Sequence, residues 1–275
     1  DPVEIDAECF TNVDNATLNI PKGSYENYAT ADNWKNFKTI KEPAHSVGDT
    51  FRASIIAGGT KVDATFKVTN TSNKNVSIGD GEDAAIDIFA SGNINIPSTV
   101  NGYDGQTYTV KKVADAAFFG CENITSISLP SSITEIGNSA FLRCYSLANI
   151  TIPTNVTRIG NEAFFYCEKL ASISIPKNVT SIGTNAFKNC NMLTSVTAGR
   201  NTPIAIDSEC FSNAANATLN VPYGAKERYE AATGWNLFKN IVEMAPKDGD
   251  MFTALTAEGV KMTFVVISAS AKTCK

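Results

Sequence analysis

Apolar residues recur at a fixed interval of 23 positions through the middle of the chain. One series consists of phenylalanines and a second, three positions later, consists of cysteines. The two series are Phe118, Phe141, Phe164 and Phe187, and Cys121, Cys144, Cys167 and Cys190. A unit this short cannot bury its own apolar side chains and has to stack on its neighbours. The pattern therefore predicts a solenoid with both series in its core.

Within one unit, residues 147–170, the spacing of apolar positions predicts two kinds of element. Ile150 and Ile152 alternate with polar neighbours, as in a half-buried strand, and Pro153 ends that strand because it cannot donate to a sheet. Residues 156–159 predict a second short strand, and Gly160 permits a turn. Residues 163–170 have room for a turn or two of helix. We therefore predict an α+β solenoid with two short strands and a short helix in each 23-residue repeat.

These positions resemble the BspA-like leucine-rich repeats of bacterial surface proteins. The motif of that family is roughly L-xx-I-x-IP-xx-V-xx-IG-xx-AF-xx-C-xx, and residues 108–200 match it nearly throughout. The period of 23 also lies within the range of about 20–29 residues that leucine-rich repeats use. The resemblance implies right-handed coils, a location at the cell surface or outside the cell, and, for some members, adhesion to host matrix proteins.

A second repetition has an offset of 201 residues, because residues 5–42 reappear as residues 206–243. The chain therefore holds one module and the start of another, and we expect it to be part of a longer polypeptide. The expected parts are 1–44, the C-terminal cap of a preceding repeat module; 45–107, a β-rich N-terminal cap or a separate small β-domain; 108–205, the solenoid coils; 206–244, a C-terminal cap; and 245–275, the start of a following module.

The two copies of the 201-residue repetition have the composition of helix-containing lids. Tyr229, Trp235 and Phe238 are spaced to form one apolar face, and the first copy has Tyr28, Trp34 and Phe37 at the same places. An aromatic-rich lid is preferred over an aromatic ligand cage, because solenoid ends need a cover with a polar outer side. We expect the first copy to dock on an end of the solenoid or on a neighbouring molecule.

The segment between the first lid and the coils contains short runs typical of β-strands. These runs, separated by glycine- and asparagine-rich turns, are 51–56, 64–69, 76–78, 85–89 and 93–96. We interpret the segment as a β-rich cap continuous with the solenoid, with a separate β-domain as the alternative.

Charge and hydropathy exclude two classes of partner. The net charge is −5 with no long basic run, which argues against a nucleic-acid partner. No run approaches the ~18 apolar residues that a membrane span needs. The start at Asp1 shows no signal peptide, so we expect any signal or anchor to lie outside this sequence.

The seven cysteines allow a disulfide framework or free buried thiols. Side chains stacked in register point parallel to one another, which is poor disulfide geometry, so free thiols are preferred. No CxxC motif occurs, and the single histidine, His45, is predicted to lie in an exposed linker. We therefore expect no metal site and no cofactor.

No catalytic set converges in the sequence. Glu135, Glu162, Asp207 and Glu209 occupy variable positions of the repeats, where a solvated surface explains them better than glycoside hydrolysis does. The acidic segment 78–83 lacks the spacing of a known calcium loop and is interpreted as a surface turn. We therefore predict that the chain is not an enzyme.

Two candidate interaction surfaces remain. The outward positions of the first strand are Ser126, Asn149, Ser172 and Ser195, which give a neutral, hydrogen-bonding face. Apolar residues also follow the phenylalanine series, namely Phe119, Leu142, Tyr145, Phe165 and Tyr166, whereas the fourth coil has Lys188 and Asn189. If these five side chains point outward they form an interaction stripe, and if they pack inward they are core, which we prefer.

The sequence favours a surface binding module, adhesin-like, for a host extracellular-matrix protein or a glycan. The alternative is a structural spacer in a tandem surface array, because repeated modules also build stalks. An enzyme is the third class, and the lack of a convergent catalytic set opposes it.

Overall fold

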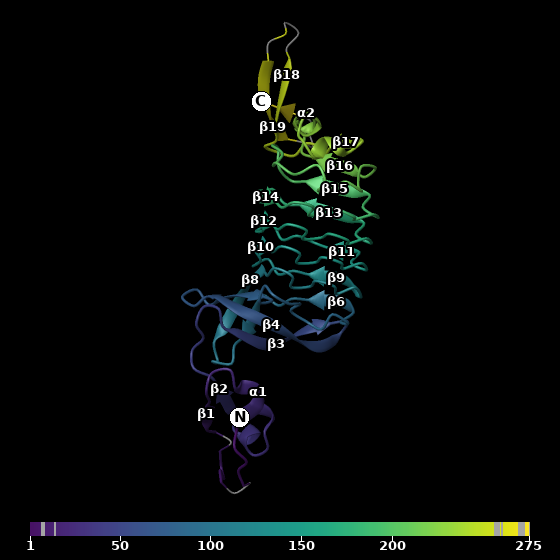
Figure 1. Cartoon of the computed structure of the whole chain (residues 1–275). Helices are drawn as coiled ribbons and strands as arrows, with labels where there is room; N and C mark the ends of the chain where they lie inside the picture. Colours follow the sequence, from purple (N-terminus) through teal and green to yellow (C-terminus); the bar gives the residue numbers. More distant parts are fainter. Residues whose placement is uncertain (7–8, 14, 256–258, 260, 269–272, 275) are drawn as a thin grey trace.

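The computed structural model describes residues 1–275 except 7–8, 14, 256–258, 260, 269–272 and 275. The chain forms an elongated stack of coils, with its N-terminal segment beyond one end and its C-terminal hairpin beyond the other (Figure 1). Short strands run in two columns along the stack. This arrangement confirms the predicted solenoid.

Each repeat up to residue 182 contributes one strand to each column, and the next repeat contributes a strand to the first column alone. The first column holds β6 (Gly92–Asn95), β9 (Ile124–Ser128), β11 (Asn149–Ile150), β13 (Ser172–Ile175) and β15 (Ser195–Ala198), and the second holds β8 (Thr107–Val113), β10 (Glu135–Ile136), β12 (Arg158–Ile159) and β14 (Ser181–Ile182). Paired strands of successive repeats are parallel, and Ile136 is opposite Ile159. The register therefore stacks equivalent residues of successive repeats.

Charged side chains follow the second column. Glu135 lies between Lys112 and Arg158, at 3.1 and 2.6 Å. Both neighbours are opposite it in the sheet. At this partial exposure such pairs help to fix the register more than they add stability.

The short helix predicted at the end of each repeat is wrong. Residues 163–170 form successive turns, with no helix. Phe164 donates its N–H to the carbonyl of Ala186 in the next coil (2.8 Å), and Tyr166 donates to that of Lys188 (3.1 Å). In an α-helix the N–H of Cys167 would bond to the carbonyl of Ala163. Instead Cys167 donates to the carbonyl of Phe164 (3.1 Å), and the Ala163 carbonyl accepts from Phe141 of the preceding coil (2.8 Å). Contact between coils therefore replaces the helix with a ladder of hydrogen bonds.

The repeated glycine is required by the close approach of the coils. A Cβ on Gly160 would lie 2.5 Å from the nitrogen of Asn138 in the preceding coil, and one on Gly183 would lie 2.3 Å from that of Asn161. These glycines do not have a positive φ. These glycines are therefore required by the contact between coils and not by the turn that the sequence suggested.

The phenylalanine series forms a continuous stack in the core. Phe118, Phe141, Phe164 and Phe187 are fully buried, and neighbouring ring centroids lie 5.1–5.3 Å apart. The ring of Phe211 extends the stack at 4.9 Å. Each ring is covered by the next coil, so the core grows by one layer per repeat.

The cysteine series lies beside the rings as free thiols. Cys144 donates its S–H to the carbonyl of Phe118 (3.1 Å), and Cys167 donates to that of Phe141 (3.2 Å). A thiol is a weak donor, and these contacts satisfy it without a disulfide. The prediction of free buried thiols is confirmed for this series.

The β-rich segment closes one end of the stack. β3 (Thr50–Ala57) and β4 (Thr60–Asn70) form an antiparallel hairpin. β3 pairs with β6 of the first column, whereas β4 pairs with β5 (Asn75–Ile78), which pairs with β8 of the second. β7 (Thr99–Asn101) lies beside β8. One 11-stranded sheet therefore bends around the end and occupies both open edges.

The strand-like run predicted at 85–89 is wrong. The segment forms bends and a turn. Ala85 donates its N–H to the carbonyl of Ala117 (2.7 Å) and accepts a bond from Thr65 (2.8 Å), so it stacks on the first coil.

The two copies of the 201-residue repetition have the same elements. The first contains β1 (Thr17–Asn19), α1 (Tyr25–Thr30), the 3-10 helix η1 (Trp34–Asn36) and β2 (Thr39–Lys41), and the second contains β16 (Thr218–Val221), α2 (Lys226–Glu230), η2 (Trp235–Leu237) and β17 (Asn240–Glu243). β16 pairs with β15, so the second copy covers the last coil. Beyond it lie β18 (Met251–Leu255), β19 (Lys261–Ser268) and β20 (Thr273–Cys274). The division of the chain into modules stays a prediction.

Candidate binding surface

Successive turns along one side of the stack carry the apolar residues that follow the core phenylalanines. We call Phe119, Leu142, Tyr145, Phe165 and Tyr166 the aromatic edge. The backbone of this edge is tied from coil to coil, because Gly120 donates to the carbonyl of Leu142 (2.9 Å) and Arg143 donates to that of Phe165 (2.9 Å). The side chains therefore project from a fixed backbone.

None of the five side chains of the aromatic edge is in the buried core. Phe119 is 40% exposed, and the other four are half-buried. The structure therefore does not place these five side chains in the core, which was the preferred interpretation of the sequence. Phe165 and Tyr166 stack at 4.5 Å, and the ring of Tyr145 meets Tyr166 edge-on at 6.3 Å. The guanidinium of Arg143 lies 6.0 Å from the ring of Phe119.

Tyr166 has an unfavourable backbone conformation. Its φ is 61°, and Gly120, Arg143 and Asn189 at the equivalent positions have φ of 70°, 62° and 61°. Glycine and asparagine tolerate this left-handed region, whereas a tyrosine there is uncommon. Strain of this kind is often found at binding sites. The stacking of coils imposes the turn whichever side chain occupies it.

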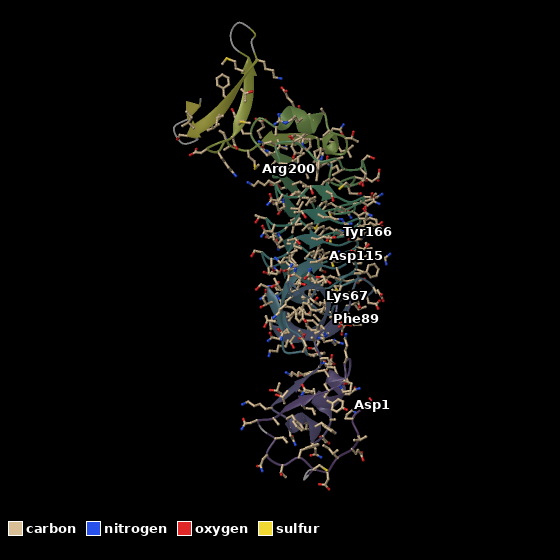
Figure 2. All side chains as sticks on the ribbon, turned by 90° about the vertical axis from the view of Figure 1, so that its left-hand side faces the viewer. Asp1, Lys67, Phe89, Asp115, Tyr166 and Arg200 are labelled. Carbon is tan, nitrogen blue, oxygen red and sulfur yellow. The ribbon has the colours of Figure 1, made fainter. Side chains whose placement is uncertain are left out.

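Two further apolar side chains lie near the aromatic edge and were missed by the sequence analysis. Phe89 is 77% exposed and Ile88 is 45% exposed. Their segment stacks on the coil that carries Phe119, and Figure 2 labels Phe89 and Tyr166 along the same side of the molecule. The available signal was an apolar pair next to a turn, which the strand assignment obscured.

The second candidate surface consists of Ser126, Asn149, Ser172 and Ser195, which we call the hydroxyl face. Asn149 is opposite Ser126 in one sheet, and Ser172 is opposite Ser195 in another. Ser126 donates its hydroxyl to Asn93 (2.7 Å), and Ser195 accepts a bond from Asn220 (3.0 Å). A hollow of about 240 Å³ lies over Ser126 and Asn149. Part of the hydrogen-bonding capacity of this face is therefore used within the protein.

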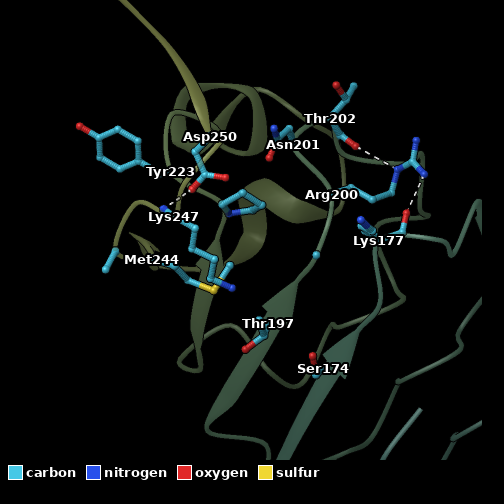
Figure 3. Close-up of a pocket in the computed structure, with 13 residues that line it drawn as sticks. Ser174, Lys177, Thr197, Arg200, Asn201, Thr202, Tyr223, Met244, Lys247 and Asp250 are labelled. Atoms are coloured by element: carbon cyan, nitrogen blue, oxygen red, sulfur yellow. Dashed lines mark hydrogen bonds between the residues drawn. The ribbon is translucent and has the colours of Figure 1, made fainter. Parts of the chain in front are cut away.

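A larger groove of about 630 Å³ lies where the last coils meet the C-terminal segment (Figure 3). It contains Lys177, Arg200, Lys247 and Asp250, which come from separate parts of the chain. Arg200 donates to the carbonyls of Lys177 (3.0 Å) and Thr202 (3.4 Å). The sequence does not predict this groove, because only folding brings its residues together. The backbone contacts of Arg200 give this cation a structural role.

The prediction that His45 lies in an exposed linker is wrong. Its side chain is buried, and the ring stacks on Phe51 at 5.2 Å. Burial favours a raised pKa for neighbouring Asp104, but bonds from the N–H groups of Gln106 and His45 and from the hydroxyl of Tyr108 bring that pKa below its usual value. The segment from the first lid to β3 is thus anchored by packing.

The buried thiols are in an unreactive state. Burial raises the pKa of Cys121 to about 12 and that of Cys210 to about 12. Burial also raises the pKa of Cys167 well above its usual value. Because the thiolate is the nucleophile, these groups are poor candidates for catalysis.

Three of the carboxylates singled out in the sequence, Glu135, Asp207 and Glu209, have structural contacts. Glu135 pairs with its two cationic neighbours, and Asp207 accepts a bond from the N–H of Asn185 (3.2 Å). Asp80 of the acidic turn accepts bonds from the N–H groups of Glu82 and Asp83. Within the described part of the chain, no group of three or more His, Cys, Asp or Glu side chains is arranged to hold a metal ion. No helix among the described residues has the length and hydropathy of a membrane span.

The solenoid coils match a model of a known family. A model described as "BspA type Leucine rich repeat region" matches residues 105–218 in six copies. This confirms the resemblance predicted from the repeat motif. A comparison with curated proteins finds no match.

Solved structures of bacterial leucine-rich repeat proteins are similar to the chain. A leucine-rich repeat protein of T. pallidum has a TM-score of 0.51 and 25% identity, over 66% of this chain and 80% of its own. The pneumococcal vaccine antigen PcpA has a TM-score of 0.48 and 22% identity, over 80% of this chain and 55% of its own. A leucine-rich repeat protein from Bacteroides capillosus has a TM-score of 0.43 and 28% identity, over 53% of this chain and 99% of its own. The first likeness agrees with the fold described above.

Proposed function

We propose that this chain, which carries a BspA-type leucine-rich repeat region, is a non-catalytic binding module at the cell surface or outside the cell. Its partner is a host extracellular-matrix protein or a glycan, bound through one side of the solenoid. The observation that carries the proposal is the aromatic edge, where apolar side chains of successive coils remain partly exposed. Apolar patches of this kind mark interaction surfaces.

The chemistry of the aromatic edge suits a binding site better than the hydroxyl face does. Tyr145, Phe165 and Tyr166 present large, rigid side chains, which lose little conformational entropy on binding. Tyrosine is also among the residues that contribute most to interfaces. The rings contact one another and their backbone is tied between coils, so the site is formed before a partner arrives.

The proposal is tested by a screen of the purified chain against arrayed matrix proteins and glycans. Any partner found is then measured with Tyr145→Ala, Phe165→Ala and Tyr166→Ala. At least one variant is expected to weaken binding by about tenfold or more, since tenfold corresponds to ~1.4 kcal/mol and a hot-spot residue at the centre of an interface contributes ~2 kcal/mol or more.

Met192→Ala is the matched control, because Met192 is an exposed apolar side chain outside the aromatic edge. It is expected to leave the affinity unchanged. If all three edge variants fold and bind the partner as tightly as the parent chain does, the assignment of the site is contradicted.

A spacer in a tandem surface array is the second candidate. It is supported by the contacts between residues 1–44 and the β-rich segment. Tyr25 stacks on Tyr103 at 4.0 Å, and the N–H of Glu42 donates to the carbonyl of Tyr103 (2.8 Å). Lys22 also pairs with Asp49. A stalk requires such ordered junctions between consecutive units.

A further inference from the structure

The two copies of the 201-residue repetition have nearly the same internal geometry. The indole N–H of Trp34 donates to the carbonyl of Val3 (2.9 Å), and that of Trp235 donates to the carbonyl of Ile204 (2.8 Å). The Tyr28–Trp34 and Tyr229–Trp235 ring pairs are both at 5.2 Å with an interplanar angle of 84°. β1 and β2 are parallel, with Leu18 opposite Ile40, and Leu219 is opposite Ile241 in the second copy. The second copy is therefore an internal reference for the first.

The second copy is covered by the last coil of the solenoid. The ring of Phe211 stacks on that of Phe187 at 4.9 Å and is 1% exposed. The backbone is joined as well, because Phe187 donates its N–H to the carbonyl of Cys210 (3.1 Å) and Thr218 donates to that of Thr194 (2.9 Å). Cys210 and Trp235 are buried as well.

The corresponding face of the first copy is uncovered. Phe10, the equivalent of Phe211, is 43% exposed, and Cys9, the equivalent of Cys210, is exposed. Trp34 and Phe37 are half-buried, whereas their equivalents are buried. Among the described residues β1 pairs only with β2, so its other edge is open, whereas β16 pairs on both sides.

We propose that this face of the first copy, formed by Cys9, Phe10, Trp34 and the open edge of β1, docks on the last coil of a preceding BspA-type repeat module. The occupant presents a phenylalanine that stacks on Phe10 and a strand that pairs in parallel with Thr17–Asn19. The chain's own last coil cannot fill this role, because residues 206–243 already cover it.

The opposite side of the first copy is already engaged. Tyr25 and Lys22 contact Tyr103 and Asp49 of the β-rich segment. With a preceding module on the free face, residues 1–44 are clamped between two solenoids. This docking does not depend on which ligand the aromatic edge binds. It would join consecutive modules into one continuous stack.

The experiment compares the chain with an extended chain, in which a copy of residues 46–201 is fused directly ahead of Asp1. This junction keeps the 201-residue spacing, so that the added coils precede Cys9 as the native coils precede Cys210. Labelling of Cys9 by Ellman's reagent is followed by mass spectrometry of the peptide that contains it. In the chain as it is, Cys9 should react readily, and in the extended chain it should react at least about tenfold more slowly, because a covered thiol reacts only after local opening.

Phe10→Lys in the extended chain is the matched variant. It removes the ring that should stack on the added coil and is expected to restore fast labelling of Cys9. In the chain without the extension, the same substitution removes only the contacts of Phe10 with the rings of Trp34 and Phe37, at 5.5 and 5.3 Å. The thermal midpoint should therefore fall less there than in the extended chain.

Equally fast labelling of Cys9 in both chains would overturn the proposal. Slow, concentration-dependent labelling of Cys9 in the chain without the extension would also overturn the proposal. In that case the occupant of the face would be a second copy of the chain. Light scattering of the same samples distinguishes that result, because a second copy doubles the mass.

Discussion

Adjacent residues of one repeat have opposite roles at the scale of the side chain. Phe164 is fully buried between two rings of the stack, whereas Phe165 is half-buried on the aromatic edge. The difference is set by the turn, which directs one side chain toward the axis and the next away from it.

Phe164→Ala is expected to lower the free energy of unfolding by about 3–5 kcal/mol, because it leaves a cavity in the core. Phe165→Ala should lower it by less than about 1.5 kcal/mol, since it removes a half-buried ring. Urea titrations of both variants provide the comparison. A similar loss for the two would show that Phe165 belongs to the core.

The buried thiols predict a loss of stability at alkaline pH. The pKa of Cys121 and that of Cys210 rise from an ordinary value of 9.0 to about 12 on folding. The folded state therefore holds these protons more tightly, and its stability is full below pH 9 and falls between pH 9 and about 12.

Thermal midpoints measured across that pH range test this expectation. Cys210→Ala should show a shallower decline than the parent chain, because one titrating group is removed. An identical pH profile for the two proteins would contradict the assignment of the decline to this thiol.

At the scale of the element, the strands could be predicted from the sequence and the turns could not. Alternation of Ile150 and Ile152 with polar residues predicts a strand there, although β11 ends at Ile150 and does not include Ile152. In contrast, residues 163–170 form turns that bond to the neighbouring coils, for example from the N–H groups of Phe164 and Tyr166 to the next coil, and these contacts have no local signal. The glycine of each repeat was assigned to a turn from the sequence, whereas its reason, the approach of two coils, is a tertiary contact.

Only part of the candidate site could be predicted from the sequence, because the exposure of a side chain also depends on tertiary contacts. The 23-residue period identified which positions vary, and so it found Phe119 and Phe165. It could not give their exposure, since that depends on how far neighbouring turns cover them. Phe89 was missed because its segment stacks on a coil without following the repeat motif.

The fourth coil supplies a natural replacement for the third coil's part of the aromatic edge. Lys188 and Asn189 occupy the positions of Phe165 and Tyr166, and Asn189 has the same φ of 61° as Tyr166. The double variant Phe165→Lys and Tyr166→Asn is therefore expected to fold with its free energy of unfolding within about 1.5 kcal/mol of the parent, because asparagine relieves strain while the rings are lost. Urea unfolding with circular dichroism checks this, and a larger loss would mean that the edge supports the fold.

At the scale of the whole molecule, the repetition of 201 residues predicted where similar elements occur. It did not predict how the ends are closed. The sheet bends around residues 50–78 because a hairpin joins the two columns, and His45 becomes buried where the first lid meets that hairpin. Such contacts link segments that are far apart in sequence, so no local sequence pattern predicts them.

Tyr103→Ala is expected to loosen the first lid from the rest of the chain. It removes the stacking on Tyr25, which is worth about 0.5–1.5 kcal/mol beyond the buried area, together with the bond from the Tyr103 hydroxyl to Glu26. Small-angle X-ray scattering should show a broader distribution of interatomic distances than in the parent chain. Met192→Ala serves as control, and an unchanged distribution for Tyr103→Ala would mean that other contacts hold the junction.

The central claim is that the chain binds a partner through the aromatic edge. The most direct measurement is the affinity of a partner found in the screen for two variants that alter the two candidate surfaces separately. Phe165→Lys with Tyr166→Asn should weaken binding by about tenfold or more, whereas Asn149→Ala with Ser172→Ala on the hydroxyl face should leave it within about threefold. The opposite ranking, or unchanged affinity for the edge variant, would contradict the account.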